Sequence, residues 1–172
     1  MKEIEFTLDA KSINKAINEL TKYKKQINNK AEVLRHSIAE LIQAEAEKRF
    51  GQSTYDVDKY TGNGLTPEIS VRWEDEGNST LVVASGEEVA FIEFGAGVHF
   101  NGSGSPHPKG QELGMTIGSY GAGNGKRDMW VYVDGEGKHF TVGTPGTAPL
   151  YKALYEATGD IAQVAREIFN SD

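Results

Sequence analysis

The sequence predicts an α+β fold: an antiparallel β-sheet of two hairpins plus an N-terminal strand, packed against two N-terminal helices and a C-terminal helix, with a long Gly-rich loop. Three observations predict it. Apolar residues recur at helical spacing near both ends of the chain, alternating segments flank glycine turns in the middle, and the helical and extended segments are grouped rather than interleaved. A length of 172 residues fits a single domain, residues 1–172.

The first third of the chain is predicted to be one strand followed by two helices. Residues 2–8 alternate apolar and polar side chains, which is the period of a half-buried strand. Helical spacing begins at Ser12, a suitable N-cap, and Asn28-Asn29 then favours a turn or a weak kink. Residues 31–50 carry a continuous apolar stripe, and Gly51 follows as a stop signal, so a second helix is expected there.

Two hairpins are predicted in the middle of the chain. Segments 68–73 and 80–85 flank the turn sequence Glu76-Gly77-Asn78-Ser79, and segments 129–133 and 138–142 flank a second glycine-containing turn. The inward-facing residues expected in the first hairpin are Ile69, Val71, Trp73, Leu81 and Val83.

Between the hairpins lie two segments of different character. Residues 89–94 are short and apolar apart from Glu93, and the pattern allows either a strand or one helical turn. Residues 95–127 contain ten of the twenty glycines and no apolar period, which predicts a long flexible loop.

The C-terminal segment is predicted to be helical from Pro149, since proline suits the first turn of a helix. Thr158-Gly159 is expected to interrupt this helix, and Asp160 can cap a final one.

Composition excludes several classes of protein. There is no cysteine, so disulfides and thiolate chemistry are excluded. The N-terminus alternates charged and apolar residues, where a secretory signal needs an apolar run, so the protein is expected to stay in the cytoplasm in which it is made. No apolar stretch is long enough to cross a bilayer, so no membrane partner is expected.

The net charge of −7 is unevenly distributed. Residues 1–50 hold ten Lys/Arg and eight Asp/Glu (+2), and residues 51–172 hold eight and seventeen (−9). So acidic a segment repels phosphate backbones, and no specific nucleic acid partner is expected.

The glycine-rich segment 121–126 (GAGNGK) resembles a nucleotide-binding loop but does not fit one. A phosphate-binding loop needs glycine where Tyr120 stands and Ser or Thr where Arg127 stands. No cofactor site is therefore predicted.

Histidines supply the remaining candidates for chemistry. His99 and His107 share the long loop, and Glu93 and His139 could approach them, which would make a small metal-dependent hydrolase. These residues lack the i, i+4 spacing of a helical metal site, so the chain is predicted not to be an enzyme. A monomeric adaptor that binds a partner protein fits the amphipathic helices as well.

Two motifs carry a resemblance to a known family. They are VAFIEFGAG at residues 89–97 and GTAPLYKAL at residues 146–154, separated by the long loop. The pair is similar to the minor structural or tail-completion (head-tail joining, neck) proteins of long-tailed bacteriophages and prophages, which have an E-F-G-T turn and an A-P-F-L-x-P-A-L helix start. Ala96 replaces the threonine, and Lys152 stands in place of the second proline.

The resemblance implies a structural virion protein that acts in head-tail joining or tail completion. It implies assembly of the subunit in the bacterial host cytoplasm into a homo-oligomeric ring, such as a hexamer, around the DNA channel. In this ring the subunit contacts other phage tail and neck proteins. A ring needs two different complementary patches on each subunit. The expected protein interface residues are Glu93, Phe94, Gly95, Pro149, Leu150, Tyr151 and Leu154. Phe94 fits an interface and an ordinary core position equally well.

Overall fold

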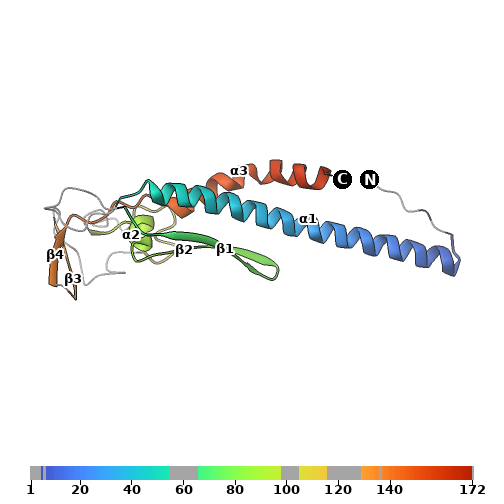
Figure 1. Cartoon of the computed structure of the whole chain (residues 1–172), viewed down its shortest axis with the longest axis horizontal. Coiled ribbons are helices and arrows are strands. Elements are labelled where there is room, and N and C mark those ends of the chain that lie inside the picture. The colour runs from blue at the N-terminus through green and yellow to red at the C-terminus, as the bar shows by residue number, and fades with distance from the viewer. Residues whose placement is uncertain are drawn as a thin grey trace. The chain divides into compact units, whose positions relative to one another are not determined.

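The computed structural model describes residues 5, 7–54, 66–97, 105–115, 129–135 and 137–171. In chain order the elements are the helix α1 (Ala10–Gly51), the strands β1 (Ser70–Glu76) and β2 (Ser79–Ser85), the helix α2 (Val89–Phe94), the strands β3 (Trp130–Asp134) and β4 (Gly137–Thr141), and the helix α3 (Pro149–Asn170) (Figure 1). The protein is mixed helix and antiparallel strand, which confirms the predicted α+β class.

The N-terminal region forms one helix of 42 residues, so the predicted turn at Asn28-Asn29 is wrong. No glycine or proline occurs between Ala10 and Phe50, and an asparagine inside a helix costs less than about 0.7 kcal/mol relative to alanine. Two such residues do not offset the backbone hydrogen bonds that a break would forfeit.

The start of α1 also differs from the prediction, since Asp9 rather than Ser12 is the cap. The Asp9 Oδ1 atom accepts hydrogen bonds from the backbone N–H groups of Lys11 (3.0 Å) and Ser12 (2.9 Å). Ser12 Oγ accepts a hydrogen bond from the Thr7 N–H. The strand predicted over residues 2–8 lies mostly outside the described residues, and Glu5, Thr7 and Leu8 are not in a strand.

The two hairpins form separate two-stranded sheets in the described part of the chain, where one sheet was predicted. β1 and β2 pair antiparallel from Ser70 opposite Ser85 to Glu76 opposite Ser79. Gly77 has a φ of 64°, as the first position of a type II′ turn requires. On β1, Val71 is buried and Trp73 is half-buried, whereas Leu81 on β2 is exposed. β3 and β4 pair from Trp130 opposite Thr141 to Asp134 opposite Gly137.

α3 runs without a break through Thr158-Gly159, so the predicted interruption is also wrong. A glycine inside a helix costs about 1 kcal/mol relative to alanine, which the surrounding turns of a 22-residue helix outweigh.

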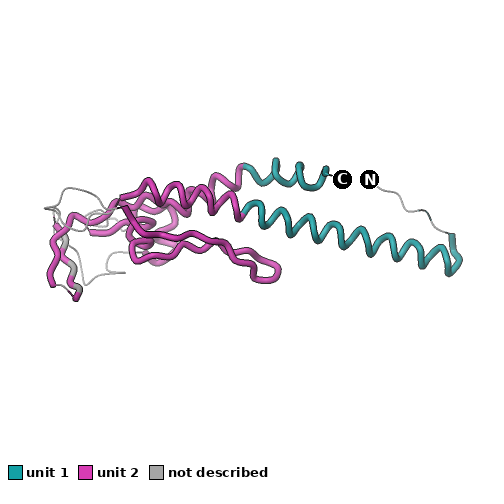
Figure 2. The backbone as a smooth tube through the Cα atoms, viewed as in Figure 1, with its two compact units in different colours: residues 1–38, 160–172 teal, residues 39–159 magenta. Residues whose placement is uncertain are grey.

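The chain divides into two compact units (Figure 2). One comprises residues 39–159, and its largest fully buried side chains are Phe50 of α1, Ile92 of α2, Thr141 of β4 and Pro149 of α3. Its core is thus assembled from elements far apart in the sequence. The other comprises residues 1–38 and 160–172, where Lys30 Nζ donates hydrogen bonds to the backbone carbonyls of Phe169 (3.3 Å) and Ser171 at the end of α3.

Candidate functional site

Glu93, on the last turn of α2, is a buried carboxylate that caps a different helix. Its Oε2 accepts a hydrogen bond from the backbone N–H of Leu150 (2.8 Å), and its Oε1 accepts one from that of Tyr151 (2.9 Å). These groups belong to the first turn of α3, where backbone N–H groups have no partner within the helix. A negative charge there is stabilised by the helix dipole. Glu93 therefore acts as the N-terminal cap of α3.

His107 completes the shell around the Glu93 carboxylate. Its Nε2 lies 3.1 Å from Glu93 Oε1, and both side chains are buried. The Nδ1 atom accepts a hydrogen bond from the backbone N–H of Lys109 (3.0 Å), so a neutral ring carries its hydrogen on Nε2 and donates it to Glu93. The carboxylate thus receives three hydrogen bonds, which satisfies a group that is costly to bury unpaired.

The histidine is held in place by a closed turn and by two aromatic rings. Within residues 105–115, the backbone N–H of Gly110 donates to the His107 carbonyl (2.9 Å), and that of Met115 donates to the Gly110 carbonyl (2.8 Å). The ring centroid of His107 lies 4.7 Å from that of Phe94 and 5.1 Å from that of Tyr151. This described part of the glycine-rich loop is a packed turn.

Close backbone approaches join α2 to the segment before α3. The backbone N–H of Ala96 donates to the Thr144 carbonyl, and that of Thr147 donates to the Ile92 carbonyl, both at 2.8 Å. A Cβ atom at Gly97, where φ is 66°, would lie 2.6 Å from the Cα of Gly143. Glycine is therefore required at position 97 by space and by conformation.

The end of α1 reaches the same place. Ser53 Oγ donates to the Arg49 carbonyl (2.9 Å) and lies 3.2 Å from Thr147 Oγ1. Ala148 has a φ of 51°, the only positive value at a non-glycine residue in the part of the chain that the structure describes. This conformation is tolerated because α1, α2 and the Glu93 cap fix the chain on both sides of it.

The predicted interface residues all come from this cluster, and they differ in exposure. Glu93, Gly95 and Pro149 are buried within the protomer, and Phe94, Leu150 and Tyr151 are half-buried. Leu154 is 49% exposed. Its neighbour Tyr155, which is not among the predicted interface residues, is 69% exposed. The two motifs expected on two separate faces of the subunit thus meet inside one protomer.

Of the candidate metal-binding residues, Glu93 and His107 contact each other. His99 lies outside the described residues, and His139 is half-buried on β4. A metal ion on His107 would have to displace the hydrogen bond to Glu93 or the one from Lys109. The described geometry serves to anchor α3.

The cap was not predicted, although one signal for it is present in the sequence. A glutamate inside the apolar segment VAFIEF must be paired if that segment is buried. Its partners are backbone N–H groups 57 and 58 positions later, which no side-chain motif reveals.

The chain was compared with protein-family models, with curated proteins and with solved structures, and none of them matches it. Among the residues that the structure describes, no helix combines the length and the apolar character needed to cross a bilayer.

Proposed function

We propose that this chain is a structural virion protein of a tailed phage or prophage, which acts in head-tail joining or tail completion by assembling into a ring around the DNA channel. The observation that carries the proposal is the hydrogen bonding of Glu93 to the first turn of α3. It joins the two motifs on which the resemblance rests, so their residue types have a common structural reason: together they fix the start of α3.

An anchored helix start supports assembly because it orients the exposed residues that follow it. Leu154 and Tyr155 lie one turn beyond the cap and expose large apolar side chains, and the Tyr155 ring stacks on Tyr151 with centroids 6.4 Å apart. Tyrosine is among the residues that are enriched at the energetic centres of protein interfaces. We assign Leu154 and Tyr155 to the contact with a neighbouring subunit.

The excess of acidic residues in the second part of the chain suits a protein that lines a channel through which DNA slides. Residues 51–172 carry a net charge of −9, which disfavours adhesion to phosphate backbones. In the proposed ring, acidic residues of this segment line the channel.

The test is assembly of the purified full-length chain. Sedimentation velocity from micromolar to millimolar concentration and electron microscopy should show rings, and Leu154→Asp should weaken assembly. Lys152→Gln is the matched control, because it changes the net charge by the same −1 on the opposite, exposed face of the same helix turn. A strict monomer over this range contradicts the ring and favours an adaptor. Stoichiometric zinc with hydrolytic activity favours the metal-dependent hydrolase.

A further inference from the structure

The first half of α1 exposes a row of large apolar side chains. Ile17, Leu20 and Tyr23 are 53%, 55% and 52% exposed, and Ile13 is 37% exposed. They recur at spacings of three and four residues, so they share one side of the helix. Single exposed apolar residues are ordinary on protein surfaces, but a continuous row along one helix face indicates a partner.

Within the unit formed by residues 1–38 and 160–172, α3 contacts α1, but α3 ends before it reaches these exposed side chains. Lys30 binds the last carbonyls of α3, and α3 ends at Asn170. The N-terminal part of α1 extends past the end of α3 (Figure 1). The exposed residues precede Lys30 in the sequence and belong to this N-terminal part.

The spacing of the apolar residues indicates what covers them. Ile13, Leu20, Ile27 and Leu34 are each seven residues apart. A straight α-helix turns about 20° away from a seven-residue repeat in every heptad, so a sustained repeat favours helices that coil around each other. With these residues at the first heptad position, the fourth is taken by Ala16, which is 8% exposed, and by Tyr23. The next fourth-position residue is Lys30, which binds the end of α3, so the apolar repeat is confined to residues 13–27. The expected occupant is another α-helix with the same repeat.

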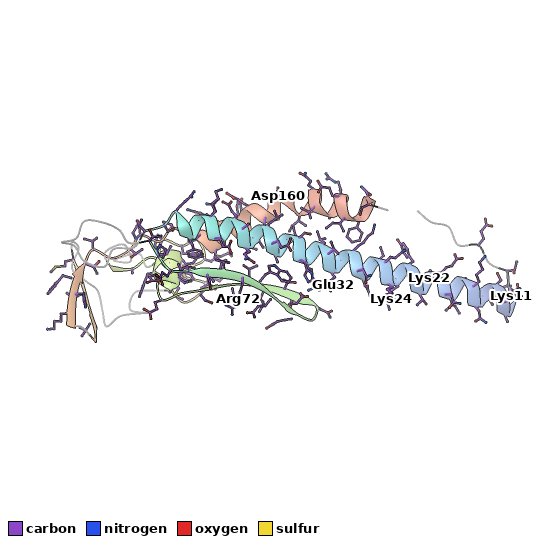
Figure 3. The ribbon with its side chains drawn as sticks, viewed as in Figure 1. Lys11, Lys22, Lys24, Glu32, Arg72 and Asp160 are labelled. Atoms are coloured by element: carbon purple, nitrogen blue, oxygen red, sulfur yellow. The ribbon has the colours of Figure 1, made fainter. Side chains whose placement is uncertain are left out.

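The charges select which helix that is. The outer heptad positions, away from the seam, are occupied by lysines: Lys11, Lys15, Lys22 and Lys25. Figure 3 labels two of them, Lys11 and Lys22, together with Lys24. Glu19 and Lys24 fall at the two positions that border the seam. When copies of this helix lie parallel and in register around a ring axis, Glu19 of one copy faces Lys24 of the next, once at each contact.

We propose that residues 13–27 of α1 form a parallel, in-register coiled coil with the same residues of a neighbouring copy of this chain. The inference rests on the self-assembly put forward as the function and names a contact that holds the copies together. Rotation about a ring axis leaves helices along that axis parallel and in register, so this contact is compatible with a cyclic assembly.

A charge exchange tests the pairing in the full-length chain. Lys24→Glu places two glutamates opposite each other and should weaken the association constant about fivefold at low salt. Glu19→Lys combined with Lys24→Glu should restore it. Lys25→Glu is the control, because it changes the net charge equally but lies on the outer face. Equal weakening by Lys24→Glu and Lys25→Glu, or failure of the double variant to recover, overturns the inference.

Cysteine cross-linking separates this contact from the proposed function, because the native chain has no cysteine. Leu20→Cys should form disulfide-linked dimers under mild oxidation, and Lys25→Cys should not, with helical content unchanged by circular dichroism. If rings form while the two variants cross-link equally, the coiled coil is wrong and the ring stands. If the chain stays monomeric and instead sediments with phosphatidylserine vesicles, both proposals fail.

Discussion

Glu93 and Leu150 are joined across 57 positions of the chain by a hydrogen bond of 2.8 Å from a backbone N–H to a buried carboxylate. The bond links the end of α2 to the start of α3. Because the Glu93 oxygens also receive the Tyr151 N–H and the His107 ring, one side chain fixes three segments that no disulfide connects. The stability of residues 39–159 should therefore depend strongly on this side chain.

Replacing Glu93 with glutamine should lower the free energy of unfolding by about 2–4 kcal/mol, because it removes the buried charge and one acceptor while the three donors remain. Urea denaturation followed by circular dichroism measures the change. Glu87→Gln is the matched control, since Glu87 is exposed two residues before the start of α2, and it should change stability by less than about 0.5 kcal/mol. Equal effects of the two substitutions would show that Glu93 is not a cap.

His107→Phe should keep the aromatic packing against Phe94 and Tyr151 but leave Glu93 with one donor fewer. The Lys109 N–H also loses its acceptor, so we expect a cost of about 1–3 kcal/mol. A double-mutant cycle with Glu93→Gln should give a coupling energy above about 0.5 kcal/mol. Additive effects would mean that the two side chains do not interact.

The elements defined by a local pattern could be predicted from the sequence. The turn of the first hairpin depends on Gly77, whose φ of 64° few other residues adopt, and α3 starts at Pro149, which suits a first helical turn. Glycine permits a backbone conformation that other residues avoid, and proline restricts its own, so neither signal needs the rest of the fold.

The errors concern weak local preferences and distant partners. Asn28-Asn29 and Gly159 were expected to break helices, but each costs about 1 kcal/mol or less and is outweighed by the helix on both sides. The cap on α3 could not be predicted, because the donors to Glu93 are backbone groups that every residue except proline has.

Gly97→Ala should destabilise the protein by about 2–4 kcal/mol. The substitution forces a side chain into a left-handed conformation, with φ at 66°, and places its Cβ 2.6 Å from the Gly143 Cα and 2.7 Å from the Val142 carbonyl oxygen. Gly51→Ala is a suitable control, because no atom lies within 4 Å of a Cβ built there. Thermal unfolding of the two variants compares them directly, and a Gly97→Ala variant as stable as the control would contradict the close approach.

The start of α1 should respond to acid. Hydrogen bonds from the Thr7 hydroxyl and from the Ser12 backbone N–H lower the pKa of Asp9 below its ordinary value of 3.8. A lowered folded pKa means that the cap is fully present above pH 3.8 and is lost as the pH falls through the folded value. Hydrogen exchange of residues 10–14 should therefore accelerate only in that acidic range, beyond the intrinsic pH effect. Asp9→Asn, which caps without titrating, should abolish this step.

Gly159→Ala distinguishes a continuous α3 from the interrupted helix that the sequence suggested. If a helix ended at position 159 in a left-handed conformation, alanine would be strained there and would destabilise the chain. In the continuous helix Gly159 is exposed, and a Cβ at this position meets no atom within 4 Å. Alanine should then raise the free energy of unfolding by about 0.5–1 kcal/mol, because it removes backbone freedom from the unfolded chain. Urea denaturation determines the sign of the change in the free energy of unfolding. A decrease would show that the helix is interrupted before Asp160.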